Sequence, residues 1–369
     1  MVSITRRKMQ RASPASNKRG ERLLTLMGAL NLVGILWILY TEQPKQKQPR
    51  SMETFGIYTF SRNLHNESID YRLDQKVTLS KLKDLGVAIP DSETIKRLPP
   101  WWMIQQQYGN GPRILGLERC YKYRQSTPRM LLGPSGLFNT GTNLISQLMQ
   151  NNCALKVTPH HFAFQAPWGK HTPPDYRGVY KIPHPHYQAM DTKSVLPLVT
   201  IRHPFDWMRS TCRVPYEVIW RHGVNDHCPN LVDPKENSTI AVTVHFGVGN
   251  HTYPTLLHLW NRWYRQYYDS VSYPRLIVRM EDLLFYPKET ISLICDCVGG
   301  DMNSSTFTVL TESAKTYARG HGTHKTGFVD GWIKYGNQRT YEQFSAVDRI
   351  AAYEIVDKDM MSYFGYVLV

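Results

Sequence analysis

Short apolar runs alternate with helical patterns of apolar residues along much of the chain. The apolar runs are Met130–Leu132, Val195–Ile201 and Arg275–Arg279, and each has a length typical of a buried strand. Helical spacing covers Asp206–Trp220 and Thr255–Ser270 between them. Strands and helices in this order predict an α/β fold in which helices flank an open parallel β-sheet.

The segment Met130–Gln150 (MLLGPSGLFNTGTNLISQLMQ) joins a predicted strand to a predicted helix through a loop of small residues. The helix carries apolar residues at helical spacing, namely Leu144, Ile145, Leu148 and Met149. Small side chains let backbone N–H groups approach an anion, and a helix N-terminus adds partial positive charge. The loop therefore fits a phosphate-binding site, although a plain structural turn would show the same composition.

Gly136–Gly141 has the spacing of a nucleotide-triphosphate P-loop, but the two residues after it differ. A P-loop continues with Lys and then Ser or Thr, which bind the phosphates and Mg²⁺. Here Thr142 and Asn143 occupy these two positions. The loop therefore predicts a P-loop-like β-sheet fold with a site for a phosphate-bearing ligand. Binding at this site would require no metal.

A second candidate for phosphate binding follows the strand candidate Val195–Ile201. Arg202 comes directly after this strand, Asp206 is placed to cap the next helix, and Ser210 lies one turn into it. Ligands bind at the carboxyl ends of strands in open α/β sheets. An arginine fork and a serine hydroxyl at this edge can converge on one phosphate. A strand exit followed by a helix cap is the structural alternative.

An uncharged apolar segment, Leu23–Tyr40, lies near the N-terminus. Its 18 residues approach the length of a membrane-spanning helix. The cations before it outnumber the three just after it, which predicts a cytosolic N-terminus and a lumenal body. We expect an uncleaved signal anchor; a cleaved signal peptide is the alternative. The expected parts are a basic tail (1–22), the transmembrane anchor (23–40), a stem with an N-terminal extension (41–115) and one lumenal domain (116–369).

Composition agrees with a folded body that binds anions. The chain has 369 residues, of which 41% are hydrophobic and 12% aromatic, so a sizeable core can form. Seven cations and Glu21 before residue 23 account for +6 of the net charge of +14, which leaves +8 for the remainder. A basic body suits a nucleotide or an acidic polymer, and a solvated basic surface would give the same charge.

Six cysteines all follow the predicted anchor, as expected for disulfides in an oxidising lumen. They are Cys120, Cys153, Cys212, Cys228, Cys295 and Cys297. Among the possible pairings we expect a Cys212–Cys228 bridge, and the sequence does not choose the others. N-glycosylation sequons also follow the anchor, at Asn66, Asn237, Asn250 and Asn303.

The two candidate phosphate sites together resemble motifs of the sulfotransferase family, which transfers a sulfuryl group from 3′-phosphoadenylyl sulfate (PAPS). The loop resembles the family's 5′-phosphosulfate loop, and Arg202-x-Pro-x-Asp-x-x-x-Ser210 resembles its 3′-phosphate motif. Arg279–Leu283 (RMEDL) is similar to the family's Y-E-D-L segment. A late region resembles the segment that closes over the cofactor; it carries Arg319, Gly320, Gly327, Trp332, Lys334 and Phe344.

The resemblance implies which residues hold PAPS. The loop would bind the 5′-phosphosulfate, and Arg202 and Ser210 would bind the 3′-phosphate. The implied cofactor-binding residues are Asn139, Thr140, Gly141, Thr142, Asn143, Arg202, Ser210, Arg319 and Gly320. The resemblance implies no metal.

Asn139 departs from the family pattern, which has Lys or Arg at this position beside the phosphosulfate bridge. An amide donates hydrogen bonds but supplies no charge. Another cation would then stabilise the leaving phosphate, and the candidates are Lys170, Lys181 and Lys325. We expect Lys170 to do so, because it adjoins the expected catalytic base.

In the family, a His or a Glu between the two phosphate motifs takes the proton from the acceptor hydroxyl. The histidines in this interval are His160, His161, His171, His184 and His186. Trp168–Pro174 (WGKHTPP) resembles the family's K-T/S-H-x-P segment, which favours His171, with His161 and His160 next. The ordinary pKa of histidine suits proton transfer at neutral pH. Glu217 lies outside the interval and is a remote candidate.

Four aromatic residues share one face of the second predicted helix: Trp260, Trp263, Tyr264 and Tyr267. Such a face can stack on sugars or bind a polyanion, but its periodicity favours a helix packed on the sheet. Residues 221–250 are expected to be loop-rich and to form an insertion over the site.

The leading prediction is a Golgi-type, single-pass type II membrane sulfotransferase that sulfates a glycan hydroxyl by in-line transfer. His171 would accept the proton, and Lys170 would neutralise charge on the leaving oxygen. The resemblance implies a glycan or other secreted or surface acceptor and no nucleic acid, and it is compatible with a homodimer. The alternatives are a protein-tyrosine sulfotransferase, a P-loop kinase or NTPase, and a non-catalytic glycan-binding protein.

Overall fold

The computed structural model describes residues 71–88, 90–126, 131–155, 165–221, 228–303, 306–312, 326–337 and 344–367. Several predicted features lie outside these residues: the basic tail, the Leu23–Tyr40 anchor, His160, His161, Arg319, Gly320 and Lys325. Within the described ranges, no helix combines the length and apolarity needed to cross a membrane.

The helices that the structure describes are α2 (Tyr71–Asp84), α3 (Ser92–Arg97), α4 (Trp101–Tyr108), α5 (Cys120–Ser126), α6 (Thr142–Asn152), α7 (Pro185–Gln188), α8 (Pro204–Arg213), α9 (Leu256–Tyr268), α10 (Asp282–Phe285), α11 (Pro287–Cys297), α12 (Phe328–Gly336), α13 (Ala346–Ile355) and α14 (Lys358–Phe364). The strands are β1 (Ile114–Leu115), β2 (Leu131–Ser135), β3 (Cys153–Leu155), β4 (Val195–Ile201), β5 (Val218–Trp220), β6 (Val232–Asp233), β7 (Ser238–Thr239), β8 (Val242–His245), β9 (Asn250–Tyr253), β10 (Leu276–Arg279) and β11 (Gly300–Met302).

The largest sheet has the strand order β1-β10-β4-β2. Strands β10, β4 and β2 are parallel, as the three apolar runs predicted. Strand β1 pairs antiparallel with β10, with Ile114 opposite Val278. The α/β class is therefore confirmed, and the predicted parallel sheet is corrected to a mixed one, because β1 adds an antiparallel strand whose two residues give no recognisable apolar run.

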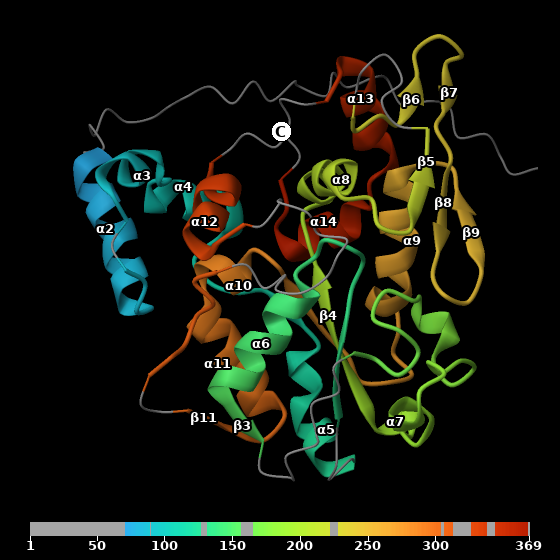
Figure 1. Ribbon diagram of the computed structural model, residues 1–369, viewed down its shortest axis with the longest axis horizontal. Helices are drawn as coiled ribbons and strands as arrows, with labels where there is room; N and C mark the ends of the chain where they lie inside the picture. Colours follow the sequence, from blue (N-terminus) through green and yellow to red (C-terminus); the bar gives the residue numbers. More distant parts are fainter. Residues whose placement is uncertain are drawn as a thin grey trace, which may run out of the picture. The chain divides into compact units, whose positions relative to one another are not determined.

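Helices cover both faces of this sheet (Figure 1). Leu196 and Leu198 of β4 belong to a buried cluster that also contains residues of α6 and α11. Val199 and Ile201 point the other way, into a cluster with residues of α8 and α9. Alternate residues of a strand face opposite sides, so burial on both faces explains why the apolar run of β4 is continuous.

Helix α8 begins and ends earlier than the pattern predicted. Its first residue is Pro204, whose fixed φ suits the start of a helix, so Asp206 lies inside the helix and does not cap it. Asp206 is buried and pairs with Arg209 at 3.5 Å. The helix ends at Arg213, shortly before Pro215, which cannot donate the helical hydrogen bond. The predicted helix over 206–220 is therefore wrong beyond residue 213.

The interval 221–250 contains strands and is not simply loop-rich. Strands β5, β8 and β9 form a three-stranded antiparallel sheet, and β6 pairs with β7. Val242 and Val244 are buried, whereas His245 is exposed. Strands of two to four residues are too short to produce a clear alternating pattern in the sequence.

All six cysteines form disulfides, and the predicted Cys212–Cys228 bridge is confirmed. The other bridges are Cys120–Cys297 and Cys153–Cys295. Both join the C-terminal end of α11 to segments that are more than a hundred residues away in the sequence, α5 and the start of β3. These two bridges therefore fix α11 against the side of the sheet that α6 covers.

Candidate anion-binding site

The loop between β2 and α6 passes close to strand β4. A Cβ atom on Gly136 would lie 2.6 Å from the Thr200 hydroxyl oxygen, so only glycine fits there. Gly141 has φ 84° and is the N-cap of α6. Because glycine has no side chain to accept hydrogen bonds from the first turn, the N-terminus of α6 is suited to an anionic ligand.

Asn139 has a left-handed backbone conformation, with φ 63°, which asparagine tolerates better than most residues. Its side-chain amide donates a hydrogen bond of 2.9 Å to the Val214 carbonyl oxygen. Its own carbonyl oxygen accepts a hydrogen bond of 2.9 Å from Nη1 of Arg202. The loop residue and the strand-end arginine, which the sequence assigns to separate motifs, are therefore in direct contact.

The remaining loop candidates differ in what their side chains do. Thr140 is buried, and its hydroxyl donates to the Leu137 carbonyl oxygen at 2.7 Å, so it stabilises the loop. Thr142 is the buried first residue of α6. Asn143 follows it, and its side-chain oxygen accepts a hydrogen bond of 2.8 Å from Nζ of Lys170.

Arg202 is the most unusual member of the site. It is 2% exposed, and its guanidinium carbon lies 4.6 Å from the centroid of the Tyr335 ring. Its Nε and Nη2 atoms are buried and have no hydrogen-bond partner among the described residues. Leaving N–H donors of a buried cation unpaired is costly, so an anion that accepted hydrogen bonds from them would stabilise this site.

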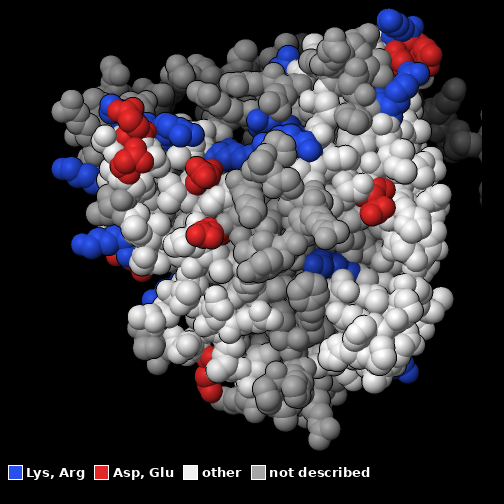
Figure 2. Space-filling view, in the orientation of Figure 1, with Lys and Arg blue, Asp and Glu red and all other residues white. Residues whose placement is uncertain are grey.

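More cations surround Arg202. Ser210 is buried, and its hydroxyl oxygen accepts a hydrogen bond of 3.3 Å from Nη2 of Arg213. Burial, with the charges of Arg202 and Arg213 as further causes, lowers the pKa of Lys334 to about 7. Figure 2 shows Lys and Arg side chains gathered in the upper middle of this face, over α8 and α12. The local excess of positive charge favours a phosphate group.

Lys170 and His171 lie against the loop. The Lys170 carbonyl oxygen accepts hydrogen bonds from the Gly136 N–H at 2.9 Å and from the Ser135 hydroxyl at 3.0 Å. Nδ1 of His171 lies 2.6 Å from the Gly136 carbonyl oxygen. The structure therefore brings both predicted catalytic residues to the start of the loop. Burial lowers the pKa of Lys170.

The contact with Gly136 determines the tautomer of His171. A carbonyl oxygen can only accept, so Nδ1 carries the proton and Nε2 keeps its lone pair. The imidazole ring also packs on Phe138, with ring centroids 4.3 Å apart. Burial, partly offset by the hydrogen bond to Gly136 and reinforced by the charge of Lys170, lowers the pKa of His171 to about 3. Nε2 is therefore the atom that could accept a proton.

The other described candidates are engaged elsewhere. Nζ of Lys181 donates to the carbonyl oxygens of Gln188 and Met190. His184 is exposed and caps α7, where its Nδ1 accepts from the His186 N–H. His186 and Glu217 are exposed.

The aromatic face of α9 is buried, which confirms the prediction of a packed helix. The polar atoms of these aromatic side chains form hydrogen bonds with residues of the site. Nε1 of Trp260 donates to the Arg202 carbonyl oxygen at 3.1 Å, and Nε1 of Trp263 donates to the His171 carbonyl oxygen at 2.9 Å. Tyr267 shares a hydrogen bond of 3.0 Å with Ser135. The sequence predicted the packing of this face but not its role in positioning these residues.

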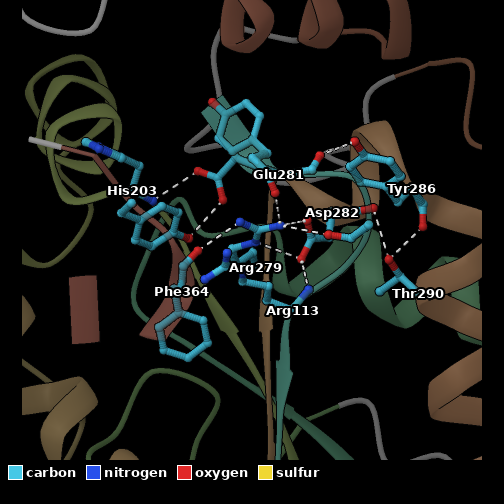
Figure 3. A network of polar contacts seen from close by, with 12 residues as sticks. Arg113, His203, Arg279, Glu281, Asp282, Tyr286, Thr290 and Phe364 are labelled. Atoms are coloured by element: carbon cyan, nitrogen blue, oxygen red, sulfur yellow. Dashed lines mark hydrogen bonds and ion pairs between the residues drawn. The ribbon is translucent and has the colours of Figure 1, made fainter. Parts of the chain in front are cut away.

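The RMEDL segment forms the buried polar network of Figure 3. Nε of Arg279 donates to the Asp282 carboxylate at 2.8 Å, and its other nitrogens donate to the carbonyl oxygens of Phe364 and Tyr108. Glu281 accepts a hydrogen bond of 3.0 Å from the His203 N–H. The segment therefore fixes the chain directly after Arg202 and ties the C-terminal helix α14 to β10.

Comparison with protein-family models found no match, and comparison with curated proteins found none either.

Proposed function

We propose that the chain is a PAPS-dependent sulfotransferase that acts on a hydroxyl of a glycan. The observation that carries the proposal is the buried guanidinium of Arg202, which contacts the glycine-rich loop and has two nitrogens without a hydrogen-bond partner in the described part of the chain. A P-loop kinase or NTPase would need the Lys-Ser/Thr pair, which Thr142 and Asn143 replace. A phosphate-rich ligand without Mg²⁺ fits these residues better.

Different residues would bind the 3′-phosphate and the 5′-phosphosulfate of PAPS. Arg202 and Ser210 would hold the 3′-phosphate, and the first turn of α6 with Asn139–Asn143 would hold the 5′-phosphosulfate. Arg319 and Gly320 complete the proposed set. Lys170, which already donates to Asn143, would supply the charge that Asn139 lacks and stabilise the departing phosphate oxygen.

His171 would serve as the general base. Its Nε2 would take the proton of the acceptor hydroxyl while the acceptor oxygen forms a bond to sulfur and the bond from sulfur to the phosphate oxygen breaks. A pKa of about 3 describes the protein without an anion beside Lys170. A bound phosphosulfate would offset the charge of Lys170, raise the pKa of His171 and make the histidine a better base.

The disulfides and the apolar segment Leu23–Tyr40 support a place in the secretory pathway. We therefore propose a single-pass type II protein of the Golgi membrane whose body faces the lumen and meets secreted or surface acceptors. A homodimer is compatible with this arrangement, and the proposal involves no nucleic acid.

The test is transfer of radiolabelled sulfate from PAPS by the purified full-length protein to a panel of glycans and tyrosine-containing peptides. We expect label on a glycan. Label on tyrosine would show that the acceptor is a protein tyrosine and not a glycan. PAPS binding without transfer would favour a non-catalytic glycan-binding protein. Absence of both binding and transfer would contradict the proposal, and Mg²⁺-dependent ATP hydrolysis would favour the kinase or NTPase alternative.

A further inference from the structure

Lys334 lies beside Arg202 on a shared aromatic ring. Its Nζ atom is 5.0 Å from the centroid of the Tyr335 ring, and the guanidinium carbon of Arg202 is 4.6 Å from the same centroid. Both cations contact the same ring, and the positive charge of Arg202 contributes to the lowered pKa of Lys334. A neutral lysine or a bound anion would relieve the repulsion between the two charges.

The acidic groups that act on Lys334 or Arg202, and the acidic residue nearest to Lys334 on its own helix, form no ion pair with Lys334. Asp206 of α8 pairs with Arg209 at 3.5 Å, and the carboxylate of Glu281 accepts from the His203 N–H and the Tyr366 hydroxyl. Asp330, one turn earlier on α12, is exposed. No acidic side chain in the described ranges forms an ion pair with Lys334.

The remaining groups that face Lys334 are basic. They are Arg202 at the end of β4 and Arg209 and Arg213 on α8. Burial and these charges together lower the pKa of the ammonium group, which is therefore about half neutral near pH 7.

We propose that Lys334 is a proton-linked part of the phosphate site, which takes up a proton from solvent when the 3′-phosphate binds beside Arg202. The inference rests on the proposed function and deepens it. A dianion between Arg202 and Lys334 replaces repulsion with attraction, so the ammonium form becomes the stable one. Above pH 7 the site then gains an additional positive charge when the ligand binds.

The sign of the pH dependence follows from this linkage. Below pH 7, Lys334 already carries its proton, and binding takes up little. Above pH 7 the free protein must first acquire the proton, so affinity falls by about tenfold for each pH unit. Lys334→Arg keeps the positive charge at every pH, and its affinity should not fall in this range.

The experiment is calorimetric titration of the full-length protein with adenosine 3′,5′-bisphosphate in buffers of different ionisation enthalpy. At pH 8 we expect uptake of about one proton per ligand by the native protein and about none by Lys334→Arg. The phosphate itself contributes little, because its second pKa is about 6. The variant also measures any proton release from the phosphate and any proton uptake by other groups of the protein.

The outcomes separate the two proposals. Binding with equal proton uptake by the native protein and the variant would overturn the role of Lys334 and leave the proposed function intact. No binding of the bisphosphate by the native protein would overturn both. If Lys334→Arg does not fold, the native protein alone decides: uptake of about one proton at pH 8 supports the proposal, and uptake that is absent at pH 8 contradicts it.

Discussion

Nη1 of Arg202 donates a hydrogen bond of 2.9 Å to the carbonyl oxygen of Asn139. The two residues are 63 positions apart and belong to the two segments that the sequence assigns to phosphate binding. The contact uses one nitrogen of the guanidinium and orients the group, while Nε and Nη2 stay buried and unpaired among the described residues. A preorganised cation of this kind binds an anion without having to reorder first.

The position of Lys170 predicts how its removal affects turnover. Lys170→Met should lower kcat by about 100-fold, because a charge beside the leaving phosphate stabilises the transition state. Lys181→Met is the matched control, since Nζ of Lys181 binds carbonyl oxygens within its own segment. Steady-state kinetics with PAPS measures both variants. Equal losses in the two variants, or none in Lys170→Met, would leave the absent charge at Asn139 unexplained.

The lowered pKa of His171 predicts the pH profile of the reaction. Because burial favours the neutral ring, the free protein keeps an unprotonated base well below pH 6. The acid limb of kcat/KM should therefore lie below pH 5, and His171→Asn should lower kcat by roughly 100-fold or more. His186→Asn, at an exposed histidine, serves as the control. An acid limb between pH 6 and 7 that His171→Asn abolishes would contradict the assigned environment.

Two tryptophans of α9 should have separable effects. Trp263→Phe removes the hydrogen bond to His171 and should lower kcat about three- to tenfold with little change in nucleotide affinity. Trp260→Phe removes the hydrogen bond to Arg202 and should mainly weaken nucleotide binding, by a similar factor. Kinetics and equilibrium binding on both variants give the comparison. If both variants changed kcat and nucleotide affinity in the same way, the substitutions would act only through the stability of the folded protein.

The Arg279–Asp282 pair should control stability rather than chemistry. Asp282→Asn leaves a fully buried guanidinium without its counter-charge and should lower the free energy of unfolding by about 3–5 kcal/mol. Glu93→Gln breaks an exposed pair with Lys96 and should leave the unfolding midpoint nearly unchanged. Denaturant unfolding measures both. A small effect of Asp282→Asn would mean that the network of Figure 3 does not hold β10 to α14.

The sequence predicted the elements that have strong, long patterns. The run Val195–Ile201 is strand β4 with the same limits, because seven apolar or small residues in a row fit only a strand buried on both faces. The helix predicted at 255–270 is α9, which begins after its cap Thr255. The start of α8 was missed because Pro204 at the first helical position outweighed the capping preference of Asp206.

Only part of the candidate site could be predicted from the sequence. The phosphate-binding roles of the glycine-rich loop and of Arg202 could be predicted, because each role depends on residues that are neighbours in the chain. The contact of Tyr335 with Arg202 could not, because more than a hundred residues separate the two and no local pattern records the contact. Lys334 belongs to the late region that the resemblance names, but its lowered pKa could not be predicted, because it arises from burial and from the charges of residues on β4 and α8.

The proposed function depends on anion binding at Arg202, which nucleotide selectivity measures. Binding of adenosine 3′,5′-bisphosphate is compared with that of adenosine 5′-monophosphate, which lacks the 3′-phosphate, in the native protein and in Arg202→Met. Arg262→Met, at an exposed arginine, is the control. The native protein should prefer the bisphosphate by about 100-fold, and Arg202→Met should lose most of that preference. Equal affinity for the two nucleotides, or a preference that survives Arg202→Met, would show that Arg202 does not bind the 3′-phosphate.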